Sequence, residues 1–326
     1  MNTLQLKAII ESDVDNKSML TDIIYFLANN SPSIKMKNAA KKKHVSLEGK
    51  KSDFYAKLNG QFYTKPEIAE KCIAAMNIEE FSLIVEPSAG RGDFLAALPE
   101  GKEVIAMDID PKHPEVIEQD FFNFHVESHG KIAVIGNPPF GKNSAQAVAF
   151  IKHAATFADT IGFILPRTFK KTSIINKLPK NLFLKGEVEL PERAFYVECG
   201  DTIEDFGLRG VFQIWEKTDN LRKKIIEEKT HPDFSFVKKS EDHDFAVRRA
   251  GNRAGEVFNN TEDVAVQGNY FVKQNDKKVV DIFKKAWSNE LDPKIDKNKS
   301  GFKYDSAGQS TISMPEMIKI YKKYNK

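Results

Sequence analysis

The segment Asn137-Pro138-Pro139-Phe140 places an amide, two prolines and an aromatic ring directly after the apolar run 132–135. Packing alone does not require that order. The Asn137 side-chain oxygen and the Pro138 carbonyl could both accept hydrogen bonds from an exocyclic amine, and so favour the tetrahedral geometry of a nucleophilic nitrogen. The prolines would stiffen the loop, and the Phe140 ring offers a face on which a base can stack. We therefore predict that these four residues are catalytic.

A second segment, residues 86–94, reads EPSAGRGDF and contains two glycines that permit a tight turn before a helix, Gly90 and Gly92. Many Rossmann-like sheets have such a turn for structural reasons alone, so the glycines are weak support by themselves. Asp108 strengthens the prediction of a ligand site at this turn, because dinucleotide-binding folds place a carboxylate for ribose hydroxyls roughly 20 residues after the turn. Asp110 is a competing candidate, but the strand-end position favours Asp108.

A third segment places Asp120 directly before Phe121 and further aromatic residues. Asp120 could accept a hydrogen bond from an exocyclic amine, while Phe121 packs on a flat heterocycle. Taken alone, a surface acid followed by a core phenylalanine is the better interpretation of the pair. Together, the three segments predict a nucleoside-binding site beside a loop that holds a target amine. A duplex hides such an amine, so a target base in DNA would have to be flipped out.

In this order, EPSAGRGDF, AMDIDP, QDFFNF and IGNPPFG resemble the amino-methyltransferases that depend on S-adenosylmethionine (SAM). The closest resemblance is to the γ-type N6-adenine DNA methyltransferases, in which the segment that contacts SAM precedes the glycine turn; residues 60–72 look like that segment. The resemblance extends from about residue 60 to residue 217. It implies methyl transfer from SAM, as cofactor, to the N6 amine of adenine in DNA.

The resemblance also implies a role for each matching residue. Phe140 stands where the family often has tyrosine, which preserves stacking, and Lys65 separates Thr64 from Pro66, where many relatives have Thr-Pro directly. Glu86 is assigned to the methionine part of SAM, Asp108 to its ribose, and Asp120 with Phe121 to its adenine. The full set of predicted cofactor residues is Phe62, Tyr63, Thr64, Pro66, Glu86, Pro87, Gly90, Asp108, Ile109, Asp120 and Phe121.

Basic and aromatic side chains beyond residue 160 are candidates for contact with nucleic acid. Cations just past a predicted strand end suit phosphate contacts, and arginines among glycines suit close approach to phosphates or, almost equally well, a surface loop. Phe195 or Tyr196 could supply the second face of a base sandwich, although burial of the phenylalanine in the core is the favoured interpretation. The predicted substrate-binding residues are Arg167, Lys170, Lys171, Phe195, Tyr196, Arg248, Arg249 and Arg253.

From about residue 60, short apolar strands alternate with helical stretches, which is typical of a mostly parallel sheet with crossover helices. Glu86, Asp108 and Asn137 end three of these strands, where open α/β sheets bind ligands. The predicted fold class is therefore α/β, with a Rossmann-like sheet of the SAM-dependent methyltransferase type. Strands are predicted over residues 83–87, 103–110, 132–137, 161–166, 183–190 and 210–217.

We predict three regions along the chain. Residues 1–59 form a helical, lysine-rich extension, residues 60–217 the methyltransferase domain, and residues 218–326 a smaller region for target recognition. Within the last region, helices are predicted over 220–229 and 313–326. The lysines between Lys35 and Lys57 could follow a phosphate backbone, or could belong to a solvated connector.

Composition bounds the class of protein. A chain of 326 residues with 41% apolar residues can bury an enzyme-sized core, and a net charge of +3 gives no global argument for nucleic acid. Cys72 and Cys199 lie far apart and the seven histidines show no ligand spacing, so we expect no metal and a reducing compartment. Apolar runs fall short of the roughly 20 residues that span a bilayer, so we expect a cytoplasmic protein of a bacterium or of a phage- or virus-infected cell.

Three functions remain open from the sequence. Methylation of adenine N6 in DNA is favoured by the early cofactor segment and the basic C-terminal region. The same chemistry could act on a base in RNA or on a protein glutamine, because the loop reads only a planar nitrogen. A SAM-binding partner subunit without catalysis is disfavoured, since all the expected loop residues are present. The sequence does not fix the oligomeric state.

Overall fold

The computed structural model describes residues 62–126, 130–199, 202–206, 208–292, 305 and 310–325. The helices and the lysine-rich connector predicted within residues 1–59 lie outside the described residues. Two compact units are present: Phe62 and the described residues of Val197–Phe206 belong to one, and the described residues of Tyr63–Tyr196 and from 208 onward form the other.

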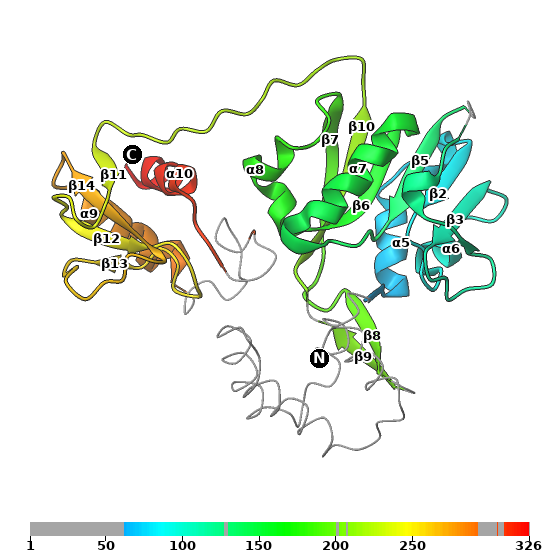
Figure 1. The fold of residues 1–326 in the computed structure, drawn as a ribbon, viewed down its shortest axis with the longest axis horizontal. Helices are drawn as coiled ribbons and strands as arrows, with labels where there is room; N and C mark the ends of the chain where they lie inside the picture. The colour runs from blue at the N-terminus through cyan, green and yellow to red at the C-terminus, as the bar shows by residue number, and fades with distance from the viewer. Residues whose placement is uncertain are drawn as a thin grey trace. The chain divides into compact units, whose positions relative to one another are not determined.

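A seven-stranded sheet forms the larger core, with the strand order β4-β3-β2-β5-β6-β10-β7 (Figure 1). Four pairings on one side are parallel, and β10 lies antiparallel between β6 and β7. The predicted α/β class with a mostly parallel, Rossmann-like sheet is confirmed, and each predicted strand is present. The strands are β2 (Leu83–Glu86), β3 (Val104–Asp108), β4 (Ile117–Glu118), β5 (Ile132–Gly136), β6 (Thr160–Pro166), β7 (Leu182–Glu189) and β10 (Gly210–Lys217).

The strand order reverses between β2 and β5. From β2 the chain continues outward to β3 and β4, and it then returns to place β5 on the other side of β2. Val85 accordingly pairs with Ile105 on one side and with Val134 on the other. At such a reversal the loops that follow the two neighbouring strands diverge and leave a crevice, where open α/β sheets bind ligands. Here these are the loops after Glu86 and Gly136.

Helices cover both faces of this sheet. The buried side of α7 (Ala145–Phe157) belongs to the same apolar cluster as Phe163 of β6. On the opposite face Met76, just beyond α5 (Pro66–Ala74), abuts Gly162. Successive residues of a strand point to opposite faces, so α5 and α7 lie on opposite sides. Among the described helices, none combines the length and the apolar character that crossing a bilayer requires.

A second core lies in the C-terminal region. Four antiparallel strands in the order β11-β14-β12-β13 share it with two helices. The predicted terminal helix is confirmed, and it begins with a capping box in which the Ser313 hydroxyl and the Glu316 carboxylate bond each other's backbone N–H groups. The elements are β11 (Phe234–Val237), β12 (Phe245–Arg248), β13 (Val257–Phe258), β14 (Asn269–Gln274), α9 (Val279–Ala286) and α10 (Met314–Tyr324).

The helix predicted over 220–229 is wrong. Residues 221–230 form no regular secondary structure, and Leu221 and Ile226 are 69% and 90% exposed. A helix of this length is marginal unless it buries an apolar face, and no such face is buried here. The backbone of Ile225 instead pairs with the side-chain amide of Asn176, donating to its oxygen at 3.0 Å and accepting from its nitrogen at 2.9 Å.

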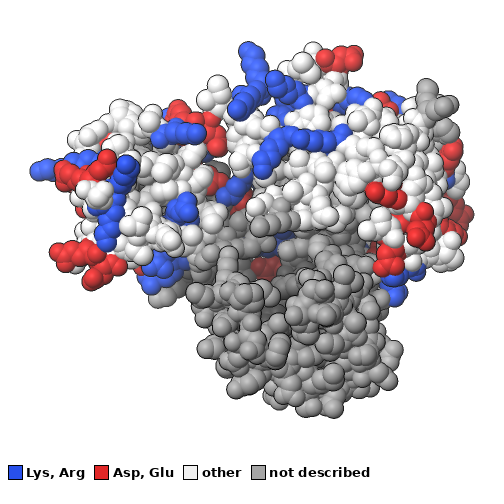
Figure 2. Space-filling view, in the orientation of Figure 1, with Lys and Arg blue, Asp and Glu red and all other residues white. Residues whose placement is uncertain are grey.

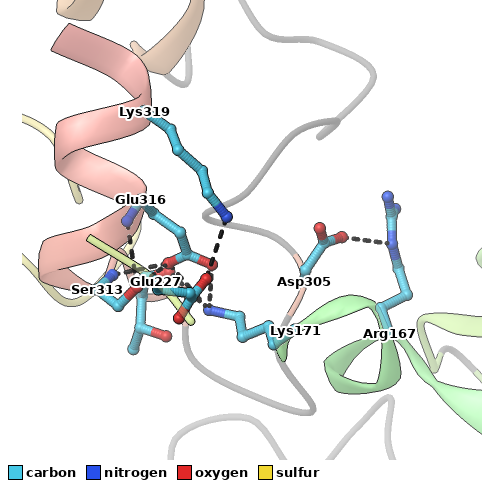
Figure 3. A network of polar contacts seen from close by, with 8 residues as sticks. Arg167, Lys171, Glu227, Asp305, Ser313, Glu316 and Lys319 are labelled. Carbon is cyan, nitrogen blue, oxygen red and sulfur yellow. Dashed lines mark hydrogen bonds and ion pairs between the residues drawn. The ribbon is translucent and has the colours of Figure 1, made fainter. Parts of the chain in front are cut away.

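Ion pairs join the loop after β6 to the C-terminal region (Figure 3). Arg167 Nε donates to Asp305 Oδ1 at 3.2 Å, and Lys171 Nζ lies 3.3 Å from Glu316 Oε1. Both cations are largely buried, so solvent screens these pairs less than it screens surface pairs. The two cores lie in one compact unit, and the division into domains at residue 217 stays a prediction.

A substitution at Gly162 tests how closely Met76, just beyond α5, packs against the sheet. A Cβ atom at this position would collide with Met76 Sδ and lie 2.8 Å from Phe212 Cζ. We expect Gly162→Ala to lower the free energy of unfolding, measured by urea denaturation, by about 1–3 kcal/mol. Gly186→Ala on β7 is the matched control, because its nearest neighbour, Ile214 Cδ1, would be 3.4 Å away. Equal losses in the two variants would contradict the packing described.

Candidate active site

The loops after β2 and β5 touch each other at the reversal. The Ser88 hydroxyl donates to the Asn137 carbonyl oxygen at 3.2 Å. A Cβ atom on Gly136 would lie 3.5 Å from Glu86 Cγ and 3.8 Å from Pro87 Cδ. Two segments that the sequence analysis chose separately are thus brought together. Ser88 was not predicted, since a serine in a glycine-containing turn gives no signal of its own.

Glu86 is buried at the end of β2, with 1% of its surface exposed. Burial raises the pKa of its carboxyl well above the ordinary value, the nearby Asp93 and Asp108 raise it further, and a hydrogen bond from the Leu95 backbone opposes them. Its Oε2 atom is buried without a hydrogen-bond partner. A buried acceptor that lacks a donor costs stability, so this atom marks a place where a ligand could supply one.

Two further predicted residues carry the same feature. Asn137 Oδ1, directly beyond β5, and Thr64 Oγ1, in β1 (Tyr63–Thr64), are buried without a hydrogen-bond partner. Nearly all buried polar atoms in folded proteins have a partner, and each exception calls for a physical reason. Asn137, predicted as an acceptor for an amine, and Glu86 and Thr64, assigned to the cofactor by the resemblance, thus each carry a buried polar atom that the fold leaves without a partner.

Asp108 fixes the glycine turn. Its Oδ2 accepts from the Gly90 N–H at 2.8 Å and its Oδ1 from the Asp110 N–H at 2.9 Å. Gly90 and Gly92 have φ angles of +52° and +78°, which glycine adopts without strain. Of the two candidate acids, Asp108 contacts the turn, and its oxygens keep lone pairs for further donors. The adjacent Ile109 is 74% exposed and offers an apolar surface beside it.

Tyr63 lies over the same turn. A Cβ atom on Gly90 would be 3.1 Å from Tyr63 Cε1, so glycine is needed for this close approach. The Arg91 guanidinium lies 5.7 Å from the centre of the Tyr63 ring, and the centre of the Tyr196 ring lies 5.4 Å from the centre of the same ring. The Tyr196 hydroxyl in turn donates to Asp93 Oδ1 at 3.1 Å. None of the contacts made by Arg91 and Asp93 was predicted.

The pairing of β1 with β8 (Phe195–Cys199) explains where the predicted aromatic pair lies. Tyr63 stands opposite Tyr196, which brings Tyr196 to the predicted cofactor residues. Phe195 is fully buried, and a ring without exposed surface cannot stack on a base. The prediction of a base-stacking Phe195 is therefore wrong, because the apolar core takes up this side chain.

Phe121 is corrected for the same reason. Its ring is 1% exposed and packs against Phe150 and His153, at centroid distances of 5.1 and 4.7 Å. It cannot pack on a heterocycle from this position, whereas the following Phe122 is 43% exposed. Asp120 caps the short 3₁₀-helix η2 (Phe121–Asn123) by accepting from the Phe122 N–H through Oδ1 at 2.9 Å.

The remaining predicted cofactor residues lie at the start of α5. Pro66 is its first residue, where proline suits a helix because the missing N–H would have no intrahelical partner. The Lys65 N–H donates to the Ala194 carbonyl at 3.1 Å and continues the β1–β8 pairing. Phe62 directly precedes β1. Among the described side chains, no group of three or more His, Cys, Asp or Glu is arranged to hold a metal ion.

The backbone that follows Phe140 is strained. Asn143 and Ser144 have φ angles of 55° and 63°, a left-handed conformation that costs free energy in residues other than glycine. Ser144 is buried, and its hydroxyl lies 2.8 Å from Thr168 Oγ1 in the 3₁₀-helix η4 (Arg167–Lys170). This bond connects the target loop to the end of β6, and no local sequence signal predicts it.

The predicted cations after β6 are paired with carboxylates. Arg167 contacts Asp305 and, at 3.7 Å, Glu189; Lys170 contacts Glu187 at 2.7 Å and also Glu189. Lys171 contacts Glu316 (Figure 3). The positive charge expected on this side is therefore largely offset in the structure. On the described part of the face in Figure 2, Lys and Arg are likewise interspersed with Asp and Glu.

The predicted C-terminal arginines make local contacts. Arg248 Nε lies 3.4 Å from Glu256 Oε2, and Arg253 pairs with the same carboxylate. The Arg248 guanidinium lies 5.2 Å from the Phe258 ring centre, and that of Arg249 lies 5.7 Å from the Tyr270 ring centre. These contacts hold the arginines on the surface of the C-terminal sheet, and their contact with phosphates stays a prediction.

No protein-family model matches this sequence, and no curated protein matches it. Solved structures resemble it at low similarity. A candidate RNA methyltransferase from Pyrococcus horikoshii is 17% identical, with a TM-score of 0.35 over 48% of this chain and 87% of its own. The 23S rRNA methyltransferase ErmE is 15% identical, with a TM-score of 0.36 over 49% of this chain and 71% of its own. The modification subunit of a candidate type I restriction enzyme from Vibrio vulnificus is 12% identical, with a TM-score of 0.37 over 68% and 54%. Likenesses this distant carry no argument about function, and the fold class of this chain rests on its own sheet topology.

Proposed function

We propose that this chain binds SAM at the crevice between β2 and β5 and transfers its methyl group to the N6 amine of adenine in DNA. One observation carries the proposal: Glu86 Oε2, at the end of β2, and Asn137 Oδ1, directly after the adjoining parallel strand β5, are buried acceptors without a partner. Buried acceptors of this kind are rare because they cost free energy. A cofactor with N–H groups at Glu86 and a target amine at Asn137 would satisfy both.

The residues of the crevice fit SAM. Glu86 would accept from the amino group of its methionine part, and Asp108 would accept from its ribose hydroxyls beside the glycine turn that it already holds. Asp120 and the exposed Ile109 would contact its adenine. Tyr63 would border the site from above the turn. When bound, SAM supplies a methyl group on a positively charged sulfur, an electrophile that needs no covalent enzyme intermediate.

The target loop would make the amine nucleophilic. Asn137 Oδ1 and the Pro138 carbonyl would accept its two N–H groups and stabilise the positive charge that develops on nitrogen as the new bond forms. Ser88 holds the Asn137 carbonyl, and the prolines restrict the backbone, so the acceptors are positioned in advance. A flipped base would stack on the half-buried Phe140 ring. The methylated nitrogen then releases one proton to solvent.

The proposal also specifies which polymer carries the amine, namely DNA. DNA is supported by the resemblance, in which the cofactor segment precedes the glycine turn. Incubation with methyl-labelled SAM and equal amounts of duplex DNA, RNA and protein should place label in DNA, as N6-methyladenine detected by mass spectrometry. If the label were confined to RNA or to a protein glutamine, that acceptor would be the substrate instead of DNA.

Asn137→Ala removes the proposed acceptor of the target amine. We expect the rate of methyl transfer to fall by roughly 100-fold or more, as for the loss of one preorganised transition-state contact. The affinity for SAM, measured by calorimetry, should stay nearly unchanged. Asn77→Ala, at an exposed position outside the crevice, is the control and should keep full activity. Normal turnover by Asn137→Ala would rule out the mechanism.

Glu86→Gln tests the buried carboxyl. A folded-state pKa above the unfolded value of about 4.3 means that the charged form is disfavoured in the fold, so stability falls as the pH rises through and above that value. Without cofactor, Glu86→Gln should therefore be more stable at pH 7 than the original protein and should lose this pH dependence in thermal melts. Its affinity for SAM should fall about tenfold or more, since a charge-assisted bond is lost.

Glu80→Gln is the matched control for that experiment. Glu80 is a partly exposed surface acid that pairs with Lys131 at 2.6 Å. Surface pairs contribute little, so both stability and SAM affinity should change only slightly. A Glu86→Gln variant that melts earlier at neutral pH than the original protein would contradict the unfavourable burial inferred for the carboxylate.

Tyr196→Phe separates two roles of this ring. If Tyr196 positions Tyr63 and the glycine turn, losing its hydrogen bond to Asp93 should weaken SAM binding by about fivefold and leave KM for DNA unchanged. Tyr324→Phe, which loses a hydroxyl bond to Glu290 in the C-terminal region, is the control. An unaltered SAM affinity in Tyr196→Phe, with a raised KM for DNA in Tyr196→Leu, would instead support base stacking.

A further inference from the structure

A cavity of about 560 Å³ lies at one side of the C-terminal sheet. It is bounded by the ends of β12 and β13, the start of β14 and the loop of residues 259–268 that connects β13 to β14. It shares no residue with the crevice between β2 and β5. The lining residues that matter here are Arg248, Phe258, Asp263, Ala265 and Asn269.

The loop that walls this cavity is held in place by side chains. Asn269 Nδ2 donates to the Ala265 carbonyl at 2.8 Å. Lys239 Nζ donates to the carbonyls of Glu262 and Val264, at 2.7 and 2.8 Å. Three carbonyls of one short loop thus have fixed partners, so the cavity has a preformed wall.

Asn269, one of the lining residues, carries an acceptor without a partner. Asn269 Oδ1 is buried and has no hydrogen-bond partner. Exchanging the amide nitrogen and oxygen would break the bond to Ala265, so the oxygen is the atom left over. A ligand that presents an N–H group to this oxygen would remove the cost of its burial.

The cavity also has a flat wall. The Arg248 guanidinium lies over the Phe258 ring, at 5.2 Å from its centre, and both side chains line the cavity. Planar groups of this kind stack on heterocycles. Arg248 is already close to Glu256, and the carboxylate of Asp263 adds negative charge to the lining. The charges therefore suit an uncharged planar ring better than they suit a phosphate.

We propose that this cavity binds one unpaired nucleobase of the substrate, stacked beside Phe258 and Arg248, with a base N–H group donating to Asn269 Oδ1. The proposal rests on the proposed function, since it takes the nucleic acid that is methylated as the source of the base. It makes the C-terminal region a reader of a base outside the target pocket. The C-terminal region would then recognise a nucleotide that is either extruded from a duplex or single-stranded.

Ala265→Leu is the variant that tests this. The added side chain should fill the cavity, while the backbone carbonyl that holds Asn269 is retained. Val266→Leu is the matched control, since Val266 is 65% exposed and does not line the cavity. Affinities of the full chain are measured by fluorescence anisotropy for a short single-stranded DNA and for an abasic strand of equal length.

Loss of one base stack should weaken binding of Ala265→Leu to the base-bearing strand by about fivefold or more. Its affinity for the abasic strand should not change, and Val266→Leu should match the original protein on both strands. Phe258→Leu, which keeps an apolar residue in β13 but removes the ring, should repeat the loss. Equal affinities of Ala265→Leu and Val266→Leu for the base-bearing strand would overturn the proposal.

Binding is measured without methyl transfer, so the two proposals fail separately. In the Asn137→Ala background the Ala265→Leu effect should persist, and it should persist even if no nucleic acid accepts a methyl group. Competition by deoxyadenosine monophosphate, but not by deoxyribose 5-phosphate, would show that the base is the group bound. Equal competition by both compounds would identify a phosphate site and overturn the proposal.

Discussion

The side-chain oxygens of Glu86 and Asn137 are buried away from water and accept no hydrogen bond in its place. Their burial therefore lowers the stability of the fold. The reversal of strand order places them at the ends of two neighbouring strands, and the Ser88 hydroxyl joins the two loops by its hydrogen bond to the Asn137 carbonyl. Left-handed backbone at Asn143 and Ser144 holds the far end of the target loop. Stability is given up at one edge of an otherwise well-packed sheet, as expected where a site must be ready before its ligands arrive.

Much of the sheet could be predicted because its information is local. Apolar runs of strand length alternate with helical segments, and the chemistry-bearing residues stand where those runs end. Glu86, Asp108 and Asn137 come from separate segments, yet the common direction of parallel strands takes their ends to one edge. The position of these side chains followed from strand polarity alone.

Contacts between distant segments could not be predicted in the same way. A sequence does not tell which of two neighbouring aromatic rings the core takes, so Phe121 was given a role that the exposed Phe122 is better placed to fill, and Phe195 was grouped with Tyr196 although the core buries it. The segment around Ile225 has helix-favouring residues, but its apolar side chains Leu221 and Ile226 stay exposed. Tertiary packing determines which rings are buried and whether this segment is helical, and amino-acid composition does not reveal that packing.

The acids that pair with Arg167 and Lys171 have a consequence for how any polyanion would bind. Asp305 and Glu316 occupy positions on these cations that phosphates would otherwise take. A nucleic acid that engages them must displace carboxylates, which then attract cations from solution as the nucleic acid gives up its own. Net counterion release is thereby reduced, and affinity should depend on salt concentration less steeply than a count of the basic residues suggests.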